Sequence, residues 1–252
     1  MRVRSERRPA LLGWEHLLAS VTTEWGLAGI KALRERVSVI VIVDVLSFST
    51  AVDVAVSRGA IVYPFPYGEK DAAQVAADRV GAVLAQPRRA AGGQFSLSPV
   101  SLTAVPEGMK LMLPSPNGSR LSLACGDTPV LTGCLRNAAV VAQAARQIAG
   151  DGDVGVVPAG ELWPDGSLRP AVEDLLGAGA IIHHLDLSCS PEGQIARDAY
   201  RTAGIDVASL IRASVSGRQL IEGGFRGDVE IAVEQNVSTR APTLRDGAYR
   251  TI

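Results

Sequence analysis

The chain has 252 residues and a formal net charge of −1; 47% of its residues are hydrophobic but only 4% are aromatic. A chain of this length can form one large domain, or two packed subdomains, and bury most of its surface without a metal or a disulfide. Its balanced charge gives no overall attraction to nucleic acid or to an anionic membrane, so neither partner is expected.

The N-terminal residues, the lack of a long apolar segment and the cysteines predict a cytoplasmic protein. Residues 1–8 are basic, as at the start of a secretion signal, but residues 9–35 carry charges at intervals and have no apolar core of signal length. No segment offers the roughly 18 uncharged apolar residues of a membrane span. Cys125, Cys134 and Cys189 lack C-x-x-C spacing, which argues against zinc and against a disulfide framework.

Hydrophobic runs alternate with amphipathic segments along the chain, which predicts strands and helices in turn. Strands are predicted at residues 37–45, 61–65, 82–85, 110–114, 129–132 and 153–157. Helices are predicted near residues 26–35, 49–58, 69–80, 171–184, 191–202, 206–213 and 216–222, with others after the strand ends at 114 and 132 and a shorter element at 228–234.

This alternation predicts an α/β protein with three α/β/α layers around a mostly parallel or mixed sheet. Residues 1–36 are expected to be an N-terminal extension with a helix, and residues 37–252 the α/β domain. Residues 86–106 contain prolines and glycines that prevent a long element, so this segment is a candidate connection between two closely packed subdomains.

Polar side chains follow four of the predicted strands. The Val- and Ile-rich run that precedes Asp44 leads into Ser49 and Thr50. Ligands gather beyond the carboxyl ends of parallel strands, so these side chains are candidates for a site. The other three strand ends lead to Asn117, Gly118, Ser119 and Arg120, to Arg136 and Asn137, and to the loop of Glu161. Turns and helix caps also favour Ser, Asn and Gly, and that interpretation stays open for each of them.

Six short motifs follow one another in an order that is informative. They are D-V-L-x-x-S-T at 44–50, N-G-S-R at 117–120, G-x-L-x-N-A at 133–138, A-G at 159–160, E-D-L-L-x-A-G-A at 173–180 and G-x-x-x-D at 224–228. In this order, and over about residues 37–252, the chain resembles the 2-phosphosulfolactate phosphatase family. The resemblance implies Mg²⁺-dependent hydrolysis of (R)-2-phospho-3-sulfolactate to (R)-3-sulfolactate and phosphate, a step of coenzyme M biosynthesis.

The resemblance also implies a set of site residues. The catalytic residues would be Asp44, Asn117, Arg120 and Glu173; the substrate-binding residues Ser49, Thr50, Gly118, Ser119, Arg136 and Asn137; and the metal ligands Asp44, Glu173, Asp174 and Asp228. Mg²⁺ usually takes one or two carboxylates together with waters and phosphate oxygens, and acidic residues can supply it here. The expected partner is a small anionic phosphorylated substrate. The oligomeric state stays open, with a homo-oligomer as one alternative.

The chemistry of phosphoryl transfer assigns a role to each group. Mg²⁺ would hold the phosphate and activate a bound water, while Arg120 and Arg136 neutralise the developing charge. Asn117 and the N–H groups of Gly118 and Ser119 would form an oxyanion cradle.

Each of these residues also has a simpler interpretation. Acidic residues such as Glu173 and Asp174 are favoured in the first turn of a helix by its dipole. Asp44 can cap the following helix, and Asp228 can belong to a turn. Arg136 can be a surface residue.

The chain departs from the family in three places. Ser47 and Phe48 stand where members typically have Arg and Ala; residues 88–93 lack the family's glutamate; and residues 95–99 form a shorter segment without its Asp and Asn. These losses motivate a second hypothesis, a non-catalytic anion- or metabolite-binding protein that retains the fold. A third hypothesis is a hydrolase of another bond type that uses the same acidic crevice.

Overall fold

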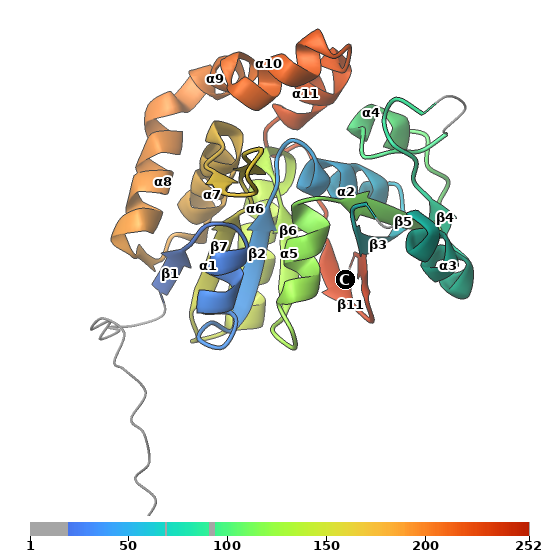
Figure 1. The fold of residues 1–252 in the computed structure, drawn as a ribbon. Helices are drawn as coiled ribbons and strands as arrows, with labels where there is room; N and C mark the ends of the chain where they lie inside the picture. The colour runs from blue at the N-terminus through green and yellow to red at the C-terminus, as the bar shows by residue number, and fades with distance from the viewer. Residues whose placement is uncertain (1–19, 69, 91–93, 252) are drawn as a thin grey trace, which may run out of the picture.

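The structure is a computed structural model that describes residues 20–68, 70–90 and 94–251 (Figure 1). The basic residues 1–8 and part of the 88–93 segment lie outside the described residues. The strands are β1 (Ser20–Thr23), β2 (Val39–Val43), β3 (Ile61–Pro66), β4 (Val83–Leu84), β5 (Lys110–Ser115), β6 (Val130–Gly133), β7 (Val154–Pro158), β8 (Glu161–Leu162), β9 (Leu168–Arg169), β10 (Ser188–Cys189), β11 (Thr243–Arg245) and β12 (Ala248–Arg250).

The helices alternate with these strands over most of the chain. They are α1 (Gly26–Leu33), α2 (Phe48–Ser57), α3 (Lys70–Val80), α4 (Pro99–Leu102), α5 (Gly118–Ala124), α6 (Ala138–Ala149), α7 (Val172–Leu185), α8 (Pro191–Ala203), α9 (Val207–Ala213), α10 (Val215–Glu222) and α11 (Arg226–Ala232), with 3₁₀ turns at Leu135–Asn137 and Gly204–Asp206. None of these helices, within the described part of the chain, is long and apolar enough to cross a membrane.

Ten strands form one sheet in the order β10-β1-β7-β2-β6-β11-β12-β3-β5-β4. The strands from β10 to β6 are parallel to one another, and β3, β5 and β4 form a second parallel group. The hairpin of β11 and β12 joins the two groups through antiparallel pairs on both of its sides. Three successive antiparallel pairings separate β6 from β3, so the two parallel groups run in opposite directions.

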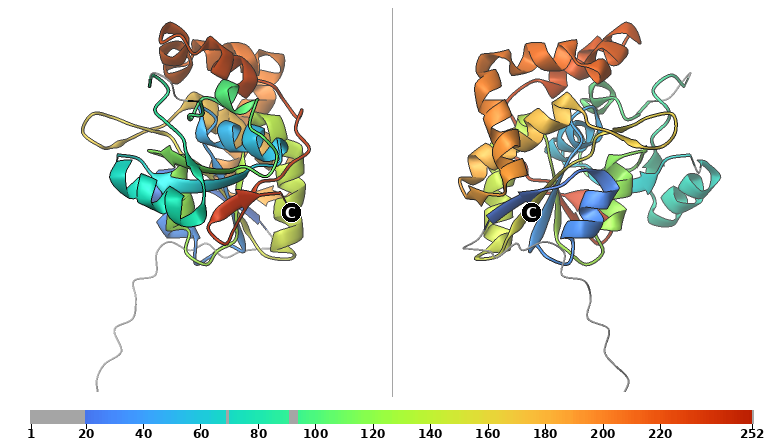
Figure 2. Two further views of the ribbon diagram at one scale, coloured as in Figure 1. Left: turned by 90° about the vertical axis from the view of Figure 1, so that its right-hand side faces the viewer. Right: turned by 60° about the vertical axis from the view of Figure 1, so that its left-hand side comes forward.

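The sheet is covered on both faces, as the three-layer prediction requires (Figures 1 and 2). Every side chain of β2 is buried, which explains its unbroken run of Val and Ile. Val39, Val41 and Val43 belong to the core that α6, α7 and α8 share. Ile40 and Ile42 belong to the opposite core, to which α1, α2 and α5 contribute. The predicted α/β/α architecture is therefore confirmed.

The C-terminal hairpin completes the second core. Tyr249 of β12 is fully buried, lies edge-on to the ring of Phe48 at 6.0 Å between centroids, and shares a 2.7 Å hydrogen bond with the Ser122 hydroxyl. Asp246 and Gly247 both have positive φ, 51° and 76°, as a tight hairpin turn requires. The last strands thus tie the two parallel groups into one sheet.

The observed elements agree with the predicted ones to within a few residues, and several short elements were not predicted. The unpredicted ones are β1, β10, α4, the β8–β9 hairpin and the β11–β12 hairpin. The β1 strand pairs with β7 and β10, so the part of the expected N-terminal extension that the structure describes is built into the main sheet. Residues 86–106 hold α4 and an isolated bridge between Gln86 and Ser96.

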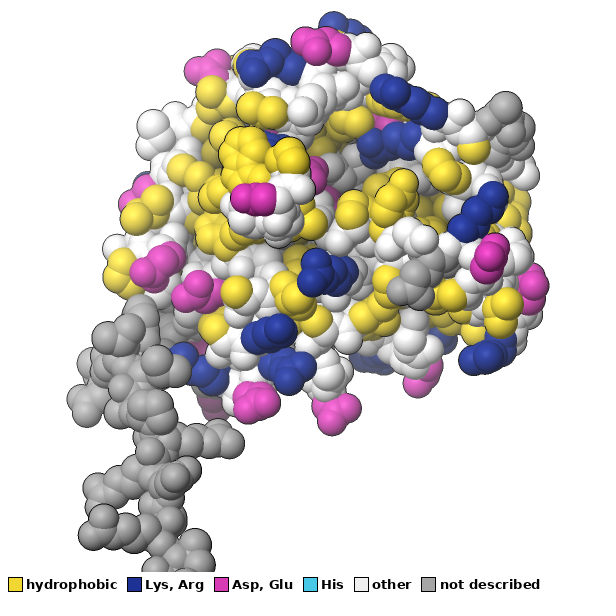
Figure 3. All heavy atoms as spheres, in the orientation of Figure 1, with side chains coloured by type: hydrophobic (Ala, Val, Ile, Leu, Met, Phe, Trp, Pro, Cys, Tyr) yellow, Lys and Arg dark blue, Asp and Glu magenta, His cyan; other side chains and the backbone are white. Residues whose placement is uncertain are grey.

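Helices α9, α10 and α11 lie across one end of the molecule, above α7 and beside α4 (Figure 1). The β8–β9 hairpin projects from the body of the protein near this end (Figure 2). On the face shown in Figure 3, basic and acidic side chains are scattered among exposed hydrophobic ones. The end of β2 points toward the region beneath these helices, where the candidate site lies.

Candidate active site

Asp44 follows β2 directly and connects two helix starts. Its Oδ1 accepts a hydrogen bond from the N–H of Phe48 at 3.2 Å, and its Oδ2 accepts one from the N–H of Gly118 at 2.9 Å. Burial raises the pKa of Asp44 to about 6, although these two bonds act in the opposite direction. The carboxyl group therefore caps the first turn of α2 and is also held in a desolvated position.

Gly118 allows β5, from the oppositely directed group of strands, to reach Asp44. A Cβ atom at this position would lie 2.2 Å from Cδ1 of Phe48, closer than side-chain carbons can approach. The absence of a side chain lets the start of α5 pack directly on α2. The N-G-S-R turn and the D-V-L-x-x-S-T turn therefore meet, as the sequence predicted, even though their strands run in opposite directions.

Asp174 and Glu173, in the first turn of α7, lie next to this turn. Asp174 accepts hydrogen bonds from the N–H of Val45 at 2.7 Å and of Gly160 at 2.8 Å. Burial, together with the charges of Asp44 and Glu173, raises the pKa of Asp174 well above its usual value. Glu173 is 2% exposed, and its Oε2 has no hydrogen-bond partner. Asp174 thus fixes two loops, whereas Glu173 has an uncommitted buried oxygen.

Glu161, at the start of β8, joins the same group. The side chain of Asn117 donates a 2.9 Å hydrogen bond from Nδ2 to Oε2 of Glu161. Burial and the nearby charge of Asp44 raise the pKa of Glu161 to about 7, while the bond from Asn117 lowers it. Glu161 consequently exchanges its proton near neutral pH, which suits a group that donates or accepts a proton in a reaction.

Arg88 supplies positive charge to this region. Its Nη2 donates to the carbonyl of Leu97 at 3.1 Å and to the hydroxyl of Ser47, and its Nε lies 3.4 Å from Oδ2 of Asp228. Burial lowers the pKa of Arg88, and the surrounding charges of Asp228, Asp44 and Glu161 raise it. The guanidinium group therefore stands beside residue 47, the position at which the sequence lacks the family's arginine.

A cavity of about 400 Å³ is lined by Arg88 and Glu161, but not by Asp44, Glu173 or Asp174. It is lined by Leu46, Tyr67, Pro87, Arg88, Arg89, Glu161, Ser216, Gln219, Leu220 and Phe225. Arg88 and Glu161 therefore line the same cavity, and helix α10 contributes Ser216, Gln219 and Leu220 to its wall. This volume lies within the range typical of small-molecule sites.

The other predicted site residues occupy several different environments. Ser49, Thr50, Ser119 and Asn137 are buried and hydrogen-bonded within their own turns or to the neighbouring strand. Arg120 is exposed and lines a separate cavity of about 180 Å³ beside Asn117. Arg136 binds Asp53 at 2.8 Å and also binds Glu234. Asp228 accepts bonds from the hydroxyl of Ser98 and the N–H of Val100, in addition to its ion pair with Arg88.

The predicted metal ligands are not arranged as one chelating group. Over the described ranges, no set of three or more His, Cys, Asp or Glu side chains is placed to hold a metal ion. Asp174 is engaged by two backbone N–H groups and Asp228 by Arg88. Asp44 likewise accepts two backbone N–H bonds. Glu173, whose buried Oε2 has no partner, is therefore the carboxylate best suited to a Mg²⁺ ion, with a further lone pair of Asp44, water and phosphate completing its shell.

Comparison with known proteins shows to which family the chain belongs. The model of the 2-phosphosulfolactate phosphatase family matches residues 29–247. The chain belongs to the 2-phosphosulfolactate phosphatase family. The chain is 35% identical over 140 residues to 2-phosphosulfolactate phosphatase of Methanothermobacter thermautotrophicus, an alignment that covers 56% of this chain and 58% of that protein. It is 26% identical over 221 residues to a probable 2-phosphosulfolactate phosphatase of Symbiobacterium thermophilum, covering 83% of this chain and 92% of the relative.

The match confirms the predicted resemblance to this family. Two residues of the site were not selected from the sequence. Glu161 stands in the loop after the predicted strand at 153–157 and has no predicted role, and Arg88 lies in the 88–93 segment that departs from the family. A charged residue directly after the A-G motif was the available signal for Glu161. No local pattern indicated that Arg88 reaches residue 47, because 41 positions separate them.

Proposed function

We propose that the chain is a Mg²⁺-dependent phosphatase that acts on a small anionic phosphomonoester, with (R)-2-phospho-3-sulfolactate as the first candidate substrate. The observation that carries this proposal is the excess of buried negative charge at the end of β2. Asp44, Glu161 and Asp174 have raised pKa values, and the buried Glu173 has an oxygen without a partner. A bound cation would favour the charged form of Asp44, whose pKa is raised mainly by burial.

Different residues would hold the cation and the phosphate. Glu173 and Asp44 would ligate Mg²⁺, which polarises the phosphate and lowers the pKa of a bound water. Arg88 would bind a phosphate oxygen, since guanidinium groups match the geometry of phosphate. Asp174 would keep the loops after β2 and β7 in place through its bonds to Val45 and Gly160.

Glu161 is suited to moving the proton. In hydrolysis, water adds to phosphorus and loses one proton to solvent, the ester P–O bond breaks, and the leaving alkoxide oxygen takes up a proton from a donor that solvent then reprotonates. With a pKa of about 7, Glu161 is partly protonated at neutral pH and can donate that proton. Asn117 holds Oε2 of this carboxyl group and so fixes its orientation.

The test is phosphate release from purified protein. We expect release from (R)-2-phospho-3-sulfolactate or a related phosphorylated hydroxy acid with Mg²⁺, and its loss with EDTA and in Asp44→Asn. Absence of release from a broad panel of phosphomonoesters, or equal release by Asp44→Asn, would overturn the proposal. A place in coenzyme M biosynthesis follows only if the sulfolactate ester is the preferred substrate.

The departures from the family favour one alternative function. Ser47 stands where members typically have Arg, and residues 95–99 form a shorter segment without the family's Asp and Asn, so the site can retain anion binding without carrying out hydrolysis. Such a non-catalytic binding protein would bind 2-phosphosulfolactate in calorimetry and release no phosphate from it over hours.

A further inference from the structure

Two residues at the start of α11 hold the side chain of Arg88. The guanidinium carbon of Arg88 lies 5.6 Å from the centroid of the Phe225 ring, and its Nε lies 3.4 Å from Oδ2 of Asp228. The side chain of Asp228 is 1% exposed and that of Arg88 is 18% exposed. A nearly buried charge pair and an aromatic ring therefore restrict the guanidinium group.

Asp228 is in turn fixed by the segment that leads into α4. Its Oδ1 accepts hydrogen bonds from the hydroxyl of Ser98 and from the N–H of Val100 at 3.2 Å. A Cβ atom at Gly227 would lie 2.9 Å from Cγ2 of Val100, so the lack of a side chain at Gly227 lets α11 pack closely on α4. One oxygen of the Asp228 carboxyl group is thus held by the start of α4, and the other lies beside Arg88.

The surroundings of Asp228 suit an ion-pair partner better than a metal ligand. The groups next to its two oxygens are an O–H, an N–H and a guanidinium group, all of which are donors. Among the described residues, Oδ2 of Asp228 and Nε of Arg88 are buried without a hydrogen-bond partner and face each other at 3.4 Å. A metal ion placed on Oδ2 would be repelled by the positive charge of Arg88.

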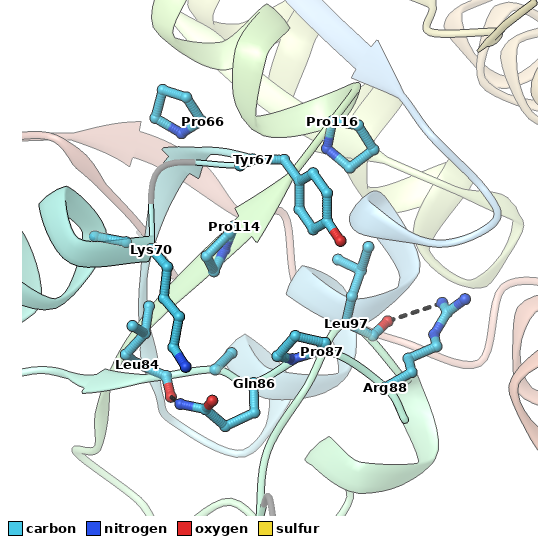
Figure 4. A pocket seen from close by; sticks show the side chains of 13 residues that line it. Pro66, Tyr67, Lys70, Leu84, Gln86, Pro87, Arg88, Leu97, Pro114 and Pro116 are labelled. Atoms are coloured by element: carbon cyan, nitrogen blue, oxygen red, sulfur yellow. Dashed lines mark hydrogen bonds between the residues drawn. The ribbon is translucent and has the colours of Figure 1, made fainter. Parts of the chain in front are cut away.

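The other end of the Arg88 side chain can bind an anion. Figure 4 shows Arg88 at one end of a cavity of about 510 Å³, where Nη2 donates to the carbonyl of Leu97. Nη2 also donates to the hydroxyl of Ser47. Within the described ranges Nη1 makes no hydrogen bond, so its N–H groups are available to a phosphate in the 400 Å³ cavity that Arg88 and Glu161 line.

We propose that Asp228 is a positioning residue, which holds the guanidinium group of Arg88 where it binds the phosphate of the substrate, and that Asp228 is not a metal ligand. This inference rests on the proposed phosphatase function, in which Arg88 binds a phosphate oxygen. It assigns to α11 and the start of α4 the task of fixing the anion-binding side chain of the site.

The test is calorimetric titration of inorganic phosphate, which requires no turnover. Asp228→Asn keeps an acceptor for Ser98 and Val100 but loses the charge beside Arg88, so the dissociation constant for phosphate should rise by about tenfold. In Arg88→Lys, Asp228→Asn should add much less, because the two residues act on phosphate through one guanidinium group. The matched control is Glu230→Gln on the same helix, where Glu230 pairs with Arg212, and it should leave the affinity unchanged.

A purely structural role for Asp228 gives different results. It would lower the free energy of unfolding of Asp228→Asn and leave the phosphate affinity of the folded protein unchanged, which overturns the inference. Equal effects of Asp228→Asn with Arg88 and with Lys at position 88 also overturn it. Titration with Mg²⁺ supplies a further test, because Asp228→Asn should retain the Mg²⁺ affinity of the unaltered protein, and its loss would make Asp228 a metal ligand.

The outcomes also distinguish this inference from the phosphatase function. Turnover of phosphomonoesters, together with a phosphate affinity that Asp228→Asn does not change, overturns the positioning role and leaves the phosphatase function intact. Phosphate binding that depends on Asp228 through Arg88, without turnover of any ester, supports the positioning role and overturns the phosphatase function. Absence of phosphate binding to the unaltered protein overturns the positioning role.

A second variant decides the question if Asp228→Asn does not fold. Ser98→Ala removes the hydroxyl that fixes Oδ1 of Asp228, and Ser98 does not line the 400 Å³ cavity. The dissociation constant for phosphate should rise by about threefold in this variant, the scale of one lost hydrogen bond, and should not rise further when Arg88 is already Lys. An unchanged phosphate affinity in Ser98→Ala would then overturn the inference.

Discussion

Two groups of charged side chains are buried near the carboxyl ends of β2 and β6, and they differ in how their charge is balanced. Around Asp53, a buried carboxylate meets the guanidinium of Arg136 at 2.8 Å, and Glu234 binds the same arginine from a half-exposed position. Around Asp44, carboxyl groups outnumber the guanidinium groups among the described residues: Asp44, Glu161, Glu173, Asp174 and Asp228 lie there with Arg88 and Arg169. Arg88 pairs with Asp228, and the charge of Arg169 lowers the pKa of Glu161.

This difference in charge balance distinguishes a group that stabilises the fold from a group suited to the reaction. A buried ion pair with matched charges holds elements together, and breaking it is costly. Burial raises the pKa of Asp53 as well, but Arg136 balances the charge of that carboxylate. An excess of buried carboxylates is unfavourable unless a ligand supplies the missing positive charge. We therefore assign the Asp53–Arg136 pair to the fold and the Asp44 group to the reaction, and we expect substitutions in the two groups to have opposite consequences.

The largest effects are expected when the aspartate at the centre of each group, Asp44 or Asp53, is replaced by asparagine. Asp44→Asn should lower kcat/KM for phosphate release by about 10²–10³-fold, the scale of losing one group that stabilises a transition state. Because the amide oxygen can accept only one of the two N–H bonds that Asp44 accepts, the free energy of unfolding should also fall by about 1–3 kcal/mol. Asp53→Asn leaves Arg136 with only the half-exposed Glu234 as a carboxylate partner, so the free energy of unfolding should fall by up to about 3 kcal/mol while kcat of the folded protein is retained. Phosphate release and urea unfolding, measured on both variants, check this contrast. If Asp53→Asn abolished turnover as fully as Asp44→Asn, the two groups would not be functionally distinct.

A smaller effect is expected at Glu161. Glu161→Gln removes the proton donor and should reduce kcat by about 10²-fold, a typical contribution of general acid catalysis. In the unaltered protein kcat/KM should fall as pH rises above about 7, because Glu161 then loses its proton. This alkaline fall should be absent from the pH profile of Glu161→Gln. An unchanged profile would remove Glu161 from the proposed mechanism.

Replacement of Arg88 should weaken substrate binding more than it affects chemistry. Arg88→Lys keeps the charge but loses the fork-shaped set of donors, so KM should rise by about tenfold with a smaller change in kcat. The matched control is Arg58→Lys at the exposed end of α2, which should leave both constants unchanged. Steady-state kinetics that show equal KM values for the two variants would contradict the role of Arg88.

The smallest effect concerns the pH dependence of stability without added metal. Asp44 and Glu161 have pKa values in the folded protein above those of the unfolded chain, so the folded state binds more protons between pH 5 and 7. Its free energy of unfolding should therefore fall as pH rises through this window, by roughly 3 kcal/mol in all, because the pKa of each of the two groups is raised by about two units. Denaturant titrations of the unaltered protein and of Glu161→Gln should show a shallower fall in the variant. A steeper fall in Glu161→Gln would contradict the assignment.

The sequence predicted the layers of the fold better than the path of its C-terminus. Buried Val and Ile runs identify β2 and β7 because both faces of these strands are covered. The β11–β12 hairpin was missed although Asp246 and Gly247 form a dipeptide that favours tight hairpin turns. The strands that flank this dipeptide have three residues each, too short to show alternation.

The site was predicted in part, for a similar reason. Asp44, Glu173 and Asn117 stand directly after strands or at helix starts, and local patterns find such positions. Arg88 and Glu161 enter the site through long-range contacts that depend on loop paths, which no local pattern encodes. The metal ligands predicted from the family remain a prediction. Asp174 and Asp228 already accept hydrogen bonds from the protein, which no local sequence pattern indicates.

Calorimetric titration of Mg²⁺ at pH 6.5, in two buffers of different ionisation enthalpy, tests most directly whether the buried carboxylates form a cation site. Metal binding at raised-pKa carboxyl groups must displace protons. We predict binding with net proton release in the unaltered protein, and the loss of both in Glu173→Gln. Absence of Mg²⁺ binding, or binding without proton release that Glu173→Gln leaves intact, would contradict this account.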